Sequence, residues 1–423
     1  MKTNTKVFFV SLGCDKNKAD SYKILKKYID KYKIILCDDV KDSDIAIINT
    51  CAFINDAKKE SEKCIHEFLT LKRKNIIKKV LVLGCLVKEY EILGKKIEGV
   101  DFALSFDKYF EELNNMEDRV YDILSFSSPL KISDGCDKKC SYCIIPKLRG
   151  RYKSNTLENV LSEARKLAKN GVKEISLVGQ DILNYGIDIY HEKKISTLLY
   201  ELNKIEGIEW IRLLYCYPEE IDDNLIEAIK QNKKVLHYID MPLQHINNNI
   251  LKSMNRPTTK EKIIEKINKL RNEIRDIVIR TTFIVGFPNE TEDDFNELVN
   301  FIREIKFDKV GVFKYSREKL SPSYDFDNQI DEQVKQKRYK YLIDTQKEIV
   351  FEKNKQYIGK TFKSIVEGYD TKKNMYVVRP YFNARDMDDK VYIDTTKNLI
   401  SGTFINVKIE KVLGYDLVGL ENE

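Results

Sequence analysis

Short apolar runs alternate with amphipathic stretches along most of the chain, and this alternation limits the possible folds more than any other feature of the sequence. Near the N-terminus, the apolar runs KVFFVSLGC, DIAIINTC and KVLVLGC are separated by stretches with helical periodicity, such as NKADSYKILKKYIDKY. The order βαβαβ is typical of a parallel sheet wrapped by helices. We therefore predict an N-terminal α/β domain over residues 1–125.

The alternation resumes from about Pro129 to about Ser316, within a predicted central domain of residues 126–353. Helical stretches such as NVLSEARKLAKNG lie between the apolar runs. The predicted strands are LKISDG, EISLVGQD, WIRLLYCYP, HYIDMPLQH, VIRTTFIVGFP and VGVFKYS. Strand and helix repeated in this way predict a partial (β/α)6 barrel, whose loops at the carboxyl ends of the strands build the site.

A different pattern follows the charged helical stretch DEQVKQKRYKYLIDTQKEIVFEKNKQ. Beyond Tyr357 the chain has short β runs separated by Gly, Asp and Asn, as in GKTFKSIVEGYD and NMYVVRPY. Short strands with turn residues between them are typical of small all-β folds. We predict a small all-β barrel over residues 354–423, so the whole chain is an α/β protein with a β appendage.

Composition excludes several classes of protein. With 73 Lys and Arg against 67 Asp and Glu, the net charge of +6 is too small to indicate a nucleic-acid partner by itself. No 18-residue apolar run and no signal-peptide pattern occur, so we expect a cytoplasmic protein without membrane contact. In that reducing compartment the nine cysteines are expected to serve metal binding or catalysis before disulfides.

Three cysteines form a compact group in the sequence GCDKKCSYC. Cys136, Cys140 and Cys143 have the spacing C-x3-C-x2-C, which lets one tight loop supply three thiolates to a 4Fe-4S cluster and leaves its fourth iron without a protein ligand. Asp134 and Gly135 precede the loop, and glycine permits the tight backbone approach. A structural zinc site requires a fourth ligand, usually Cys or His, and this loop lacks one. Zinc and a chance grouping of buried thiols are the weaker alternatives.

Three further cysteines each close an apolar, strand-like run of the N-terminal domain. Cys14, Cys51 and Cys85 are far apart in the sequence. Because the carboxyl ends of parallel strands meet at one edge of a sheet, we expect these thiols to converge there. The alternative is that they are ordinary buried cysteines. Cys37, Cys64 and Cys216 fit neither group and are interpreted as bystander thiols.

Polar residues at the ends of the central strands are candidates for binding a ligand at the barrel mouth. For most of them a structural role has equal or greater weight, and a lone histidine is more often structural. The candidates are Gln180, Asp181, Arg212, Gln244, His245 and Gly286. A basic run directly after the cysteine loop is a candidate for holding an acidic substrate or RNA, or is simply a solvated face. Its members are Lys147, Arg149, Arg151 and Lys153.

The three-cysteine loop resembles the signature of the radical S-adenosylmethionine (SAM) superfamily. This resemblance implies that the open iron binds SAM, whose reductive cleavage gives a 5′-deoxyadenosyl radical that removes a hydrogen atom from a carbon. SAM would then contact residues such as Gln180, Arg212, Gln244 and Gly286.

The motifs SLGCDKN, NTCAFI and GCL narrow the resemblance to the methylthiotransferases, which bind a second 4Fe-4S cluster through three N-terminal cysteines. Over nearly the whole chain, motifs such as LVGQDILNYGID, MPLQH and RTTFIVGFPNET are similar to the branch that modifies an aspartate of ribosomal protein S-twelve. Two segments depart from that branch. Asp15 stands where most members have Pro, and VVRPYFNARDMDDKVYI only loosely resembles the pattern GR-x-x-x-DAPEIDG-x-VY.

The resemblance implies the reaction and its partners. A methylthio group would replace a hydrogen at the β-carbon of the aspartate, with two 4Fe-4S clusters, two SAM molecules per turnover and a reducing electron donor. The enzyme would be a monomer acting near the small ribosomal subunit. The C-terminal barrel would be a TRAM module, and its 11 Lys and Arg against 10 Asp and Glu over residues 355–423 favour a protein substrate over RNA.

Three rival functions stay open from the sequence. The nearest is a tRNA adenosine methylthiotransferase, which would share the clusters and the chemistry. The second is a radical SAM enzyme with one cluster and structural N-terminal cysteines. The third is a non-catalytic metal-binding or RNA-binding module.

Overall fold

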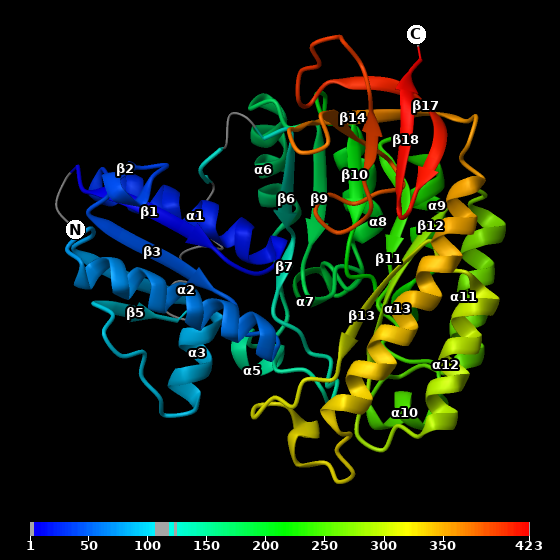
Figure 1. Cartoon of the computed structure of the whole chain (residues 1–423), viewed down its shortest axis with the longest axis horizontal. Coiled ribbons are helices and arrows are strands. Elements are labelled where there is room, and N and C mark those ends of the chain that lie inside the picture. The colour runs from blue at the N-terminus through cyan, green and yellow to red at the C-terminus, as the bar shows by residue number, and fades with distance from the viewer. Residues whose placement is uncertain (1–3, 106–117, 122–124, 423) are drawn as a thin grey trace.

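The computed structural model of the chain describes residues 4–105, 118–121 and 125–422 and has three parts (Figure 1). The N-terminal part is a sheet with helices on both faces. The central part is a larger curved sheet with helices outside it, and the C-terminal part is a small barrel that lies against one end of the central sheet. None of the described helices has the length and apolar character that crossing a bilayer requires.

The N-terminal sheet is parallel, with the order β2-β1-β3-β4-β5. Its strands are β1 (Lys6–Ser11), β2 (Ile35–Leu36), β3 (Ile45–Thr50), β4 (Lys79–Gly84) and β5 (Phe102–Leu104), and its helices are η1 (Val40–Asp42), α1 (Asp15–Tyr32), α2 (Asn55–Arg73) and α3 (Cys85–Ile92). Every residue of β3 is buried, as expected for a central strand covered on both faces. The strand order reverses between β1 and β3, and ligands bind at such a switch point.

The central sheet is also parallel, with the order β13-β12-β11-β10-β9-β6, and it does not close. Its strands are β6 (Ser127–Lys131), β9 (Glu174–Val178), β10 (Trp210–Leu213), β11 (Val235–Asp240), β12 (Val278–Val285) and β13 (Lys309–Lys314), with a short pair β7 (Ser133–Asp134) and β8 (Lys153–Ser154) beyond β6. Each strand carries Val, Ile or Leu on the side that packs against the helices.

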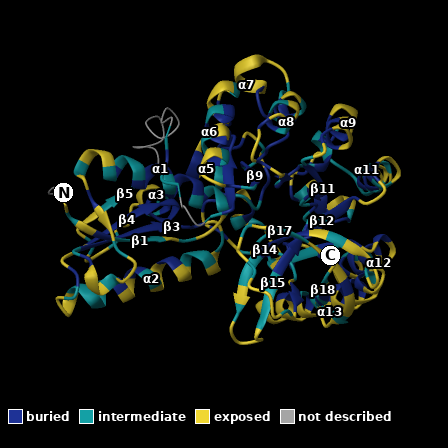
Figure 2. Ribbon diagram, turned by 90° about the horizontal axis from the view of Figure 1, so that it is seen from above, coloured by how far each residue is buried: buried dark blue, intermediate teal, exposed yellow. Residues whose placement is uncertain are grey.

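Helices enclose this sheet on its outer side, with exposed residues facing away from it (Figure 2). The helices of this part are α5 (Ile145–Arg149), α6 (Leu157–Lys169), α7 (Ile187–Tyr190), α8 (Ile195–Asn203), α9 (Asp223–Gln231), α10 (Asn248–Ser253), α11 (Lys260–Glu273), α12 (Glu292–Ile305) and α13 (Glu332–Lys355), with short 3-10 turns η2 (Pro218–Glu220) and η3 (Pro322–Asp325). Among them, α5 packs against α3 of the N-terminal domain. Helix α12 begins at a capping box in which Thr291 and Asp294 satisfy each other's backbone N–H groups, which fixes where this helix starts.

The C-terminal barrel is closed by five strands in the order β14-β15-β16-β18-β17. These strands are β14 (Thr361–Asp370), β15 (Met375–Pro380), β16 (Val391–Ile393), β17 (Phe404–Leu413) and β18 (Asp416–Glu421). The barrel shares an apolar core with the central domain, in which the ring of Trp210 meets that of Phe404 edge-on at 4.9 Å.

The predicted fold class is confirmed in all three parts. The N-terminal domain is a parallel α/β sheet, the six predicted central strands form an open parallel barrel, and the C-terminal strands close into a small barrel. Helix α1 of the N-terminal domain packs on β6, the first strand of the central domain, so the carboxyl ends of both sheets come to a common junction.

Candidate iron-sulfur and SAM site

The loop of Cys136, Cys140 and Cys143 follows β6 and β7, at the carboxyl end of the first central strand. Gly135 has a positive φ of 69°, and a Cβ atom there would lie 2.1 Å from the carbonyl oxygen of Arg151. The loop is closed by a hydrogen bond from the Cys136 N–H to the Gly150 carbonyl at 3.2 Å. Glycine is therefore required at residue 135 for the chain to turn into this loop.

The thiols of this loop are shielded from water. Cys136 and Cys140 are each 5% exposed, and Cys143 is half-buried. Burial, with neighbouring cysteines, raises the pKa of Cys136 to about 11 and that of Cys143 to about 12. Thiols in such surroundings are neutral at pH 7 and ionise only when a metal compensates their charge, so they fit ligands of a metal centre better than free nucleophiles.

Arg256 is a neighbour of this loop that the sequence did not single out. Its Nη1 lies 4.0 Å from the Sγ of Cys140, and its guanidinium lies 4.4 Å from the ring centroid of Tyr217. Its Nη2 donates to Glu219 and to the Pro242 carbonyl, each at 3.3 Å. A buried cation beside a cysteine sulfur is suited to offset the negative charge of a cluster that accepts an electron.

Two predicted residues lie near the loop with acceptor atoms unused. The Oε1 of Gln180 and the Oδ1 of Asp181 are buried and have no hydrogen-bond partner in the part of the chain that the structure describes. The other oxygen of Asp181 accepts from Asn184 at 2.7 Å and lies 3.8 Å from the Nζ of Lys138 in the cysteine loop. Orphaned acceptors beside the loop fit the ammonium or hydroxyl donors of a bound SAM molecule.

Arg212 has partners that fit a structural role, one of the two roles we expected for it with equal weight. Its Nε pairs with Glu174 at 2.8 Å, and its Nη1 donates to the Tyr381 carbonyl of the C-terminal barrel at 3.0 Å. The side chain is 1% exposed. These partners tie two of its nitrogens to the junction with the C-terminal barrel, while its buried Nη2 has no hydrogen-bond partner among the described residues.

Gln244, His245 and Gly286 shape the carboxyl ends of β11 and β12. Gln244 has a φ of 73° and exchanges backbone hydrogen bonds of 2.8 Å with β12. Gly286 also has a positive φ, and a Cβ there would lie 2.3 Å from the Lys335 side chain, so the backbone conformation favours glycine at this position. Burial lowers the pKa of His245 to about 4, and the imidazole is therefore neutral and enclosed. A structural role for His245 is favoured.

The N-terminal cysteines follow the ends of three adjacent strands. Cys14 follows β1 and is exposed, Cys51 follows β3 and is buried, and Cys85 begins α3 directly after β4 and is buried. Gly13 has a positive φ, and a Cβ there would lie only 2.6 Å from the Cβ of Cys51. The loops of Cys14 and Cys51 are thus in direct contact at the switch point of the sheet, as the strand pattern predicted.

These three thiols also lie close enough to influence one another. Burial, followed by the charges of Cys85 and Cys14, raises the pKa of Cys51 to about 12. No three Cys, His, Asp or Glu side chains among the described residues form a cage for a single metal ion. A cluster of four irons and four sulfides is larger than one ion, and three thiols spaced around a shared edge suit it better.

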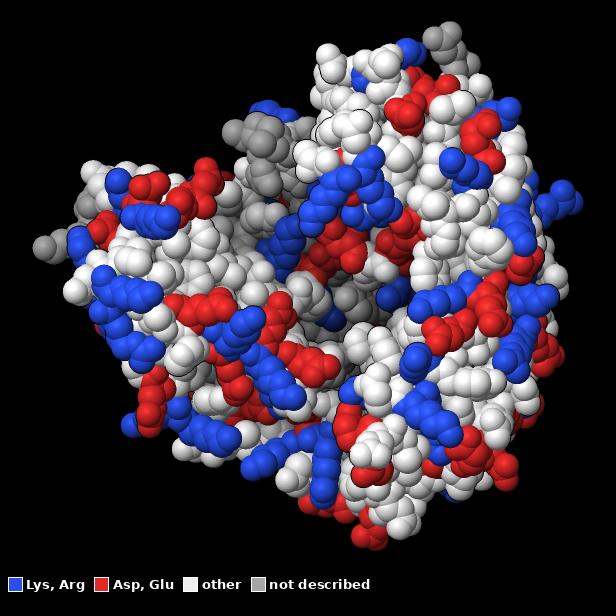
Figure 3. Space-filling model, in the orientation of Figure 1, with Lys and Arg blue, Asp and Glu red and all other residues white. Residues whose placement is uncertain are grey.

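The basic run after the cysteine loop divides into buried and exposed members. Arg149 is 8% exposed and pairs with Asp20 of α1 at 2.7 Å, so it is not available to a substrate, and our expectation for this residue is wrong. Lys147, Arg151 and Lys153 are exposed. In the space-filling view the surface is hollowed where the N-terminal and central domains meet, and side chains of both signs gather around the hollow (Figure 3).

The bystander cysteines lie outside both groups. Cys216 is fully buried after β10, and Cys37 and Cys64 are half-buried in the N-terminal domain. The Sγ of Cys37 lies 3.5 Å from the Asp42 carbonyl, a local contact within its own loop.

Profiles of three known families match successive parts of the chain. Residues 6–105 match an uncharacterized protein family, UPF0004, residues 130–302 match the radical SAM superfamily, and residues 358–420 match the TRAM domain.

The chain is similar over almost its full length to curated proteins named ribosomal protein uS12 methylthiotransferase RimO. It is 43% identical to the protein of Clostridium botulinum (strain Eklund 17B) over 99% of this chain and 98% of the relative, and 45% identical to that of Clostridium kluyveri over 98% of each. Among solved structures, the radical SAM methyltransferase TsrM of Kitasatospora setae, with cobalamin and a [4Fe-4S] cluster bound, has a TM-score of 0.54. It is 15% identical over 76% of this chain and 77% of its own, a likeness of fold alone.

Proposed function

Because the chain belongs to the RimO family of radical SAM methylthiotransferases, we propose that it inserts a methylthio group at the β-carbon of an aspartate in ribosomal protein uS12. Full-length identity of 42–45% to several such enzymes supports this assignment. The observation that carries it is that Arg149, which follows the loop of Cys136, Cys140 and Cys143, binds Asn17, which joins the loops of Cys14 and Cys51. Both three-cysteine sets therefore belong to one domain junction, as sulfur insertion requires of a radical source and a sulfur source.

The radical SAM family implies one 4Fe-4S cluster and SAM, and we infer a second cluster bound by the N-terminal cysteines. The proposed ligands are Cys136, Cys140 and Cys143 for the SAM-binding cluster and Cys14, Cys51 and Cys85 for the other. When bound, these groups supply reductive cleavage of one SAM molecule, hydrogen removal from the substrate carbon, and sulfur methylated by a second SAM molecule. Support comes from the buried, clustered thiols and from the orphaned acceptors of Gln180 and Asp181.

The residues around the loop of Cys136, Cys140 and Cys143 hold this loop in position and are proposed to bind SAM. Arg256 stands against the Cys140 sulfur, and Lys138 is paired with Glu220, which also accepts from Lys193 at 2.7 Å. These ion pairs hold the loop at the mouth of the barrel. Gln180, Arg212, Gln244 and Gly286 are proposed as SAM contacts, and the unpartnered Oε1 of Gln180 and Nη2 of Arg212 support the first two. Buried apolar strands behind the loop keep water away from a radical.

We extend the proposal to the organisation of the protein. The chain is inferred to divide into domains of residues 1–125, 126–353 and 354–423, each with its own sheet or barrel. We further infer a monomer in the cytoplasm that acts on or near the small ribosomal subunit and takes its electrons from a separate reducing donor.

The two-cluster proposal is tested by anaerobic reconstitution with iron and sulfide. We expect about eight irons per wild-type chain and about four in Cys136→Ala or Cys14→Ala, since each cluster has four irons. Cys136→Ala should form no 5′-deoxyadenosine, whereas Cys14→Ala should still form it without methylthiolated product. About four irons in the wild type, or product from Cys14→Ala, would contradict the second cluster.

The substrate is tested by mass spectrometry of ribosomal proteins and of digested tRNA from a strain that lacks the gene. We expect uS12 to lose the mass of one methylthio substitution while tRNA nucleosides stay unchanged. An unchanged uS12 together with loss of a methylthio adenosine would show that the substrate is tRNA.

A further inference from the structure

One asparagine joins the loops of two N-terminal cysteines. The side-chain Nδ2 of Asn17 donates to the Leu12 carbonyl at 2.8 Å and to the Thr50 carbonyl at 3.0 Å. Leu12 lies two residues before Cys14, and Thr50 lies directly before Cys51. Both N–H groups of a buried amide are therefore used to hold these two loops together.

The side-chain oxygen of Asn17 accepts a hydrogen bond from a residue of α5, the helix that follows the loop of Cys136, Cys140 and Cys143. The Nη2 of Arg149 donates to the Asn17 Oδ1 at 2.8 Å, and Arg149 also lies beside the Cys85 thiol, where its charge opposes the rise in the pKa of Cys85 that burial causes. Arg149 lies in α5, six residues after Cys143. A single guanidinium thus reaches all three N-terminal cysteine loops, two through Asn17 and one directly.

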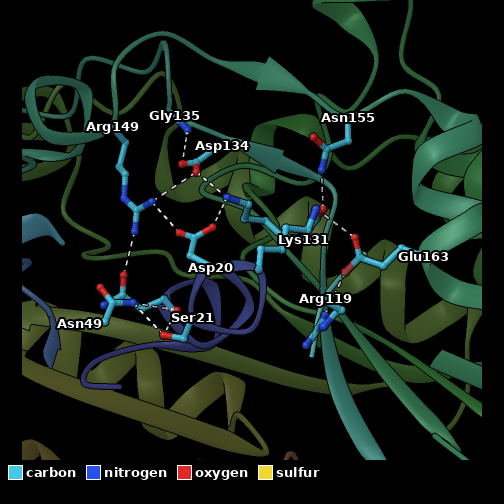
Figure 4. Close-up of polar contacts among 12 residues, drawn as sticks. Asp20, Ser21, Asn49, Arg119, Lys131, Asp134, Gly135, Arg149, Asn155 and Glu163 are labelled. Atoms are coloured by element: carbon cyan, nitrogen blue, oxygen red, sulfur yellow. Dashed lines mark hydrogen bonds and ion pairs between the residues drawn. The ribbon is translucent and has the colours of Figure 1, made fainter. Parts of the chain in front are cut away.

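Two buried carboxylates hold the other side of this guanidinium (Figure 4). Its Nη1 lies 2.7 Å from Asp20 of α1 and 3.3 Å from Asp134, and both carboxylates also bind Lys131. The second oxygen of Asp134 accepts from the Gly135 N–H at 2.8 Å, directly before Cys136. The same cluster of charges therefore fixes the start of the SAM-binding loop.

The charges in this cluster balance, with two cations and two carboxylates. Asp20 is fully buried and Asp134 is 1% exposed. Ions cannot stay buried in this way unless each is paired and hydrogen-bonded, so the geometry tolerates little displacement of any member.

We propose that Arg149, held by Asn17, Asp20 and Asp134, is a positioning residue that fixes the spacing and orientation of the two cysteine sets relative to each other. The inference rests on the proposed function, because it assigns these sets to two clusters. The guanidinium works as a rigid fork that reaches an amide, two carboxylates and a thiol at once. A lysine ammonium keeps the charge but is a single point, and it cannot span these partners together.

The test compares wild type with Arg149→Lys in the full, reconstituted protein. We expect Arg149→Lys to keep about eight irons and to form 5′-deoxyadenosine at nearly the wild-type rate. Its yield of methylthiolated product per 5′-deoxyadenosine should fall about 10- to 100-fold, the loss that follows when reacting groups are misplaced by about 1 Å. The magnetic coupling between the two reduced clusters, measured by electron paramagnetic resonance, should change as well.

Arg119→Lys is the matched control. Arg119 is 2% exposed, lies at the same junction, and donates to Glu163 and to the Pro129 carbonyl, each at 2.9 Å, while Glu163 binds Lys23 of α1 at 3.2 Å. It touches neither cysteine set. Arg119→Lys should leave the product ratio and the cluster coupling at the wild-type values even if it lowers thermal stability.

Three results would refute the positioning role of Arg149. Unchanged ratio and coupling in Arg149→Lys would refute the positioning role, as would the same loss in Arg119→Lys. A fall of Arg149→Lys to about four irons would also refute it, since Arg149 would then be needed to retain a cluster. If Arg149→Lys does not fold, Asp20→Asn keeps the shape and removes one charge partner, and it should lower the product ratio about tenfold. About four irons in the wild type would contradict the proposed function itself.

Discussion

Glu174 joins the C-terminal barrel to the central sheet through buried ion pairs. It lies at the start of β9, is 1% exposed, and accepts from Arg212 at 2.8 Å and from Arg379 of β15 at 3.0 Å. Ser127 adds a weaker hydrogen bond at 3.3 Å. Replacing Glu174 by Gln keeps the volume and removes the charge, so the buried Arg212 loses its carboxylate partner and Arg379 keeps only Glu367, at 2.6 Å.

The size of the effect follows from the pKa of Glu174. Burial alone would raise it, but Arg379 and Arg212 outweigh burial and lower the pKa from 4.5 to about 2. That difference corresponds to about 3 kcal/mol of stabilisation of the charged form. Removing one partner of a buried ion pair costs a similar amount, about 3–5 kcal/mol.

Hydrogen exchange of the amides in β14, β15 and β16 reports this local stability, which suits a protein with several domains better than a single melting curve. A loss of about 3 kcal/mol speeds exchange through opening of the barrel about 100-fold. The matched control is Glu209→Gln, which removes an exposed ion pair of 3.0 Å to Lys363 across the same interface and should cost less than about 1 kcal/mol. Exchange in Glu174→Gln within about twofold of the control would refute the reasoning.

The same carboxylate gives a pH dependence with a definite sign. The pKa of Glu174 is lower in the folded state than in the unfolded chain, so its stabilisation is complete above about pH 4.5 and is lost as the pH falls towards 2. In cluster-free protein, the protection of the barrel amides, which is their exchange relative to the intrinsic rate at each pH, should therefore fall over that acidic range more steeply in the wild type than in Glu174→Gln.

Three further predictions concern the cysteine loops. Gly135→Ala should reduce reconstituted iron from about eight to about four per chain, because the new Cβ meets the Arg151 carbonyl at 2.1 Å and displaces the loop; iron at the wild-type level would contradict this. Arg256→Gln should retain both clusters but lower the reduction potential of the SAM-binding cluster by about 60 mV in an anaerobic redox titration, because a positive charge beside Cys140 is removed. This shift equals about 1.4 kcal/mol for one electron. An unchanged potential would exclude a role for the charge of Arg256. Cys216→Ser should leave the iron content at about eight, since this thiol lies in neither set, and a loss of iron would make it a ligand.

The fold and the convergence of the N-terminal cysteines were predictable because both follow from local pattern. Parallel strands end at one edge, so a cysteine after each of β1, β3 and β4 must come near the others, and the contact between Gly13 and Cys51 bears this out. The C-x3-C-x2-C loop was equally predictable, because its three cysteines lie close together in the sequence. Their service as cluster ligands is a prediction still to be tested.

The residues that the sequence did not reveal depend on distant partners. Arg149 looked like one member of an exposed basic run, yet its partner Asp20 lies 129 positions away in the N-terminal domain. Arg256 lies 116 positions from Cys140, and nothing in its local sequence marks it as a neighbour. For Arg212 the strand position was right, but its partner Glu174 and the Tyr381 carbonyl turn it towards the C-terminal barrel. Such pairings depend on how the domains pack against one another, and the hydrophobic periodicity of the sequence carries no information on that packing.

The two departures from the family pattern gain a meaning from this packing. Asp15, beside Cys14, stands where most members of the family have proline. Arg385 stands where the family pattern DAPEIDG has its proline. Both line one small cavity, together with Lys18, Asp386 and Arg212, where the N-terminal domain, the central sheet and the C-terminal barrel meet. An acidic and a basic residue thus stand in place of neutral ones on the lining of the same cavity, where burial raises the pKa of Asp15 and the charges of Lys18 and Arg385 oppose that rise. Because residues of opposite charge share this junction between the three parts, the departures are compatible with an unchanged junction and are not by themselves a sign of a different substrate.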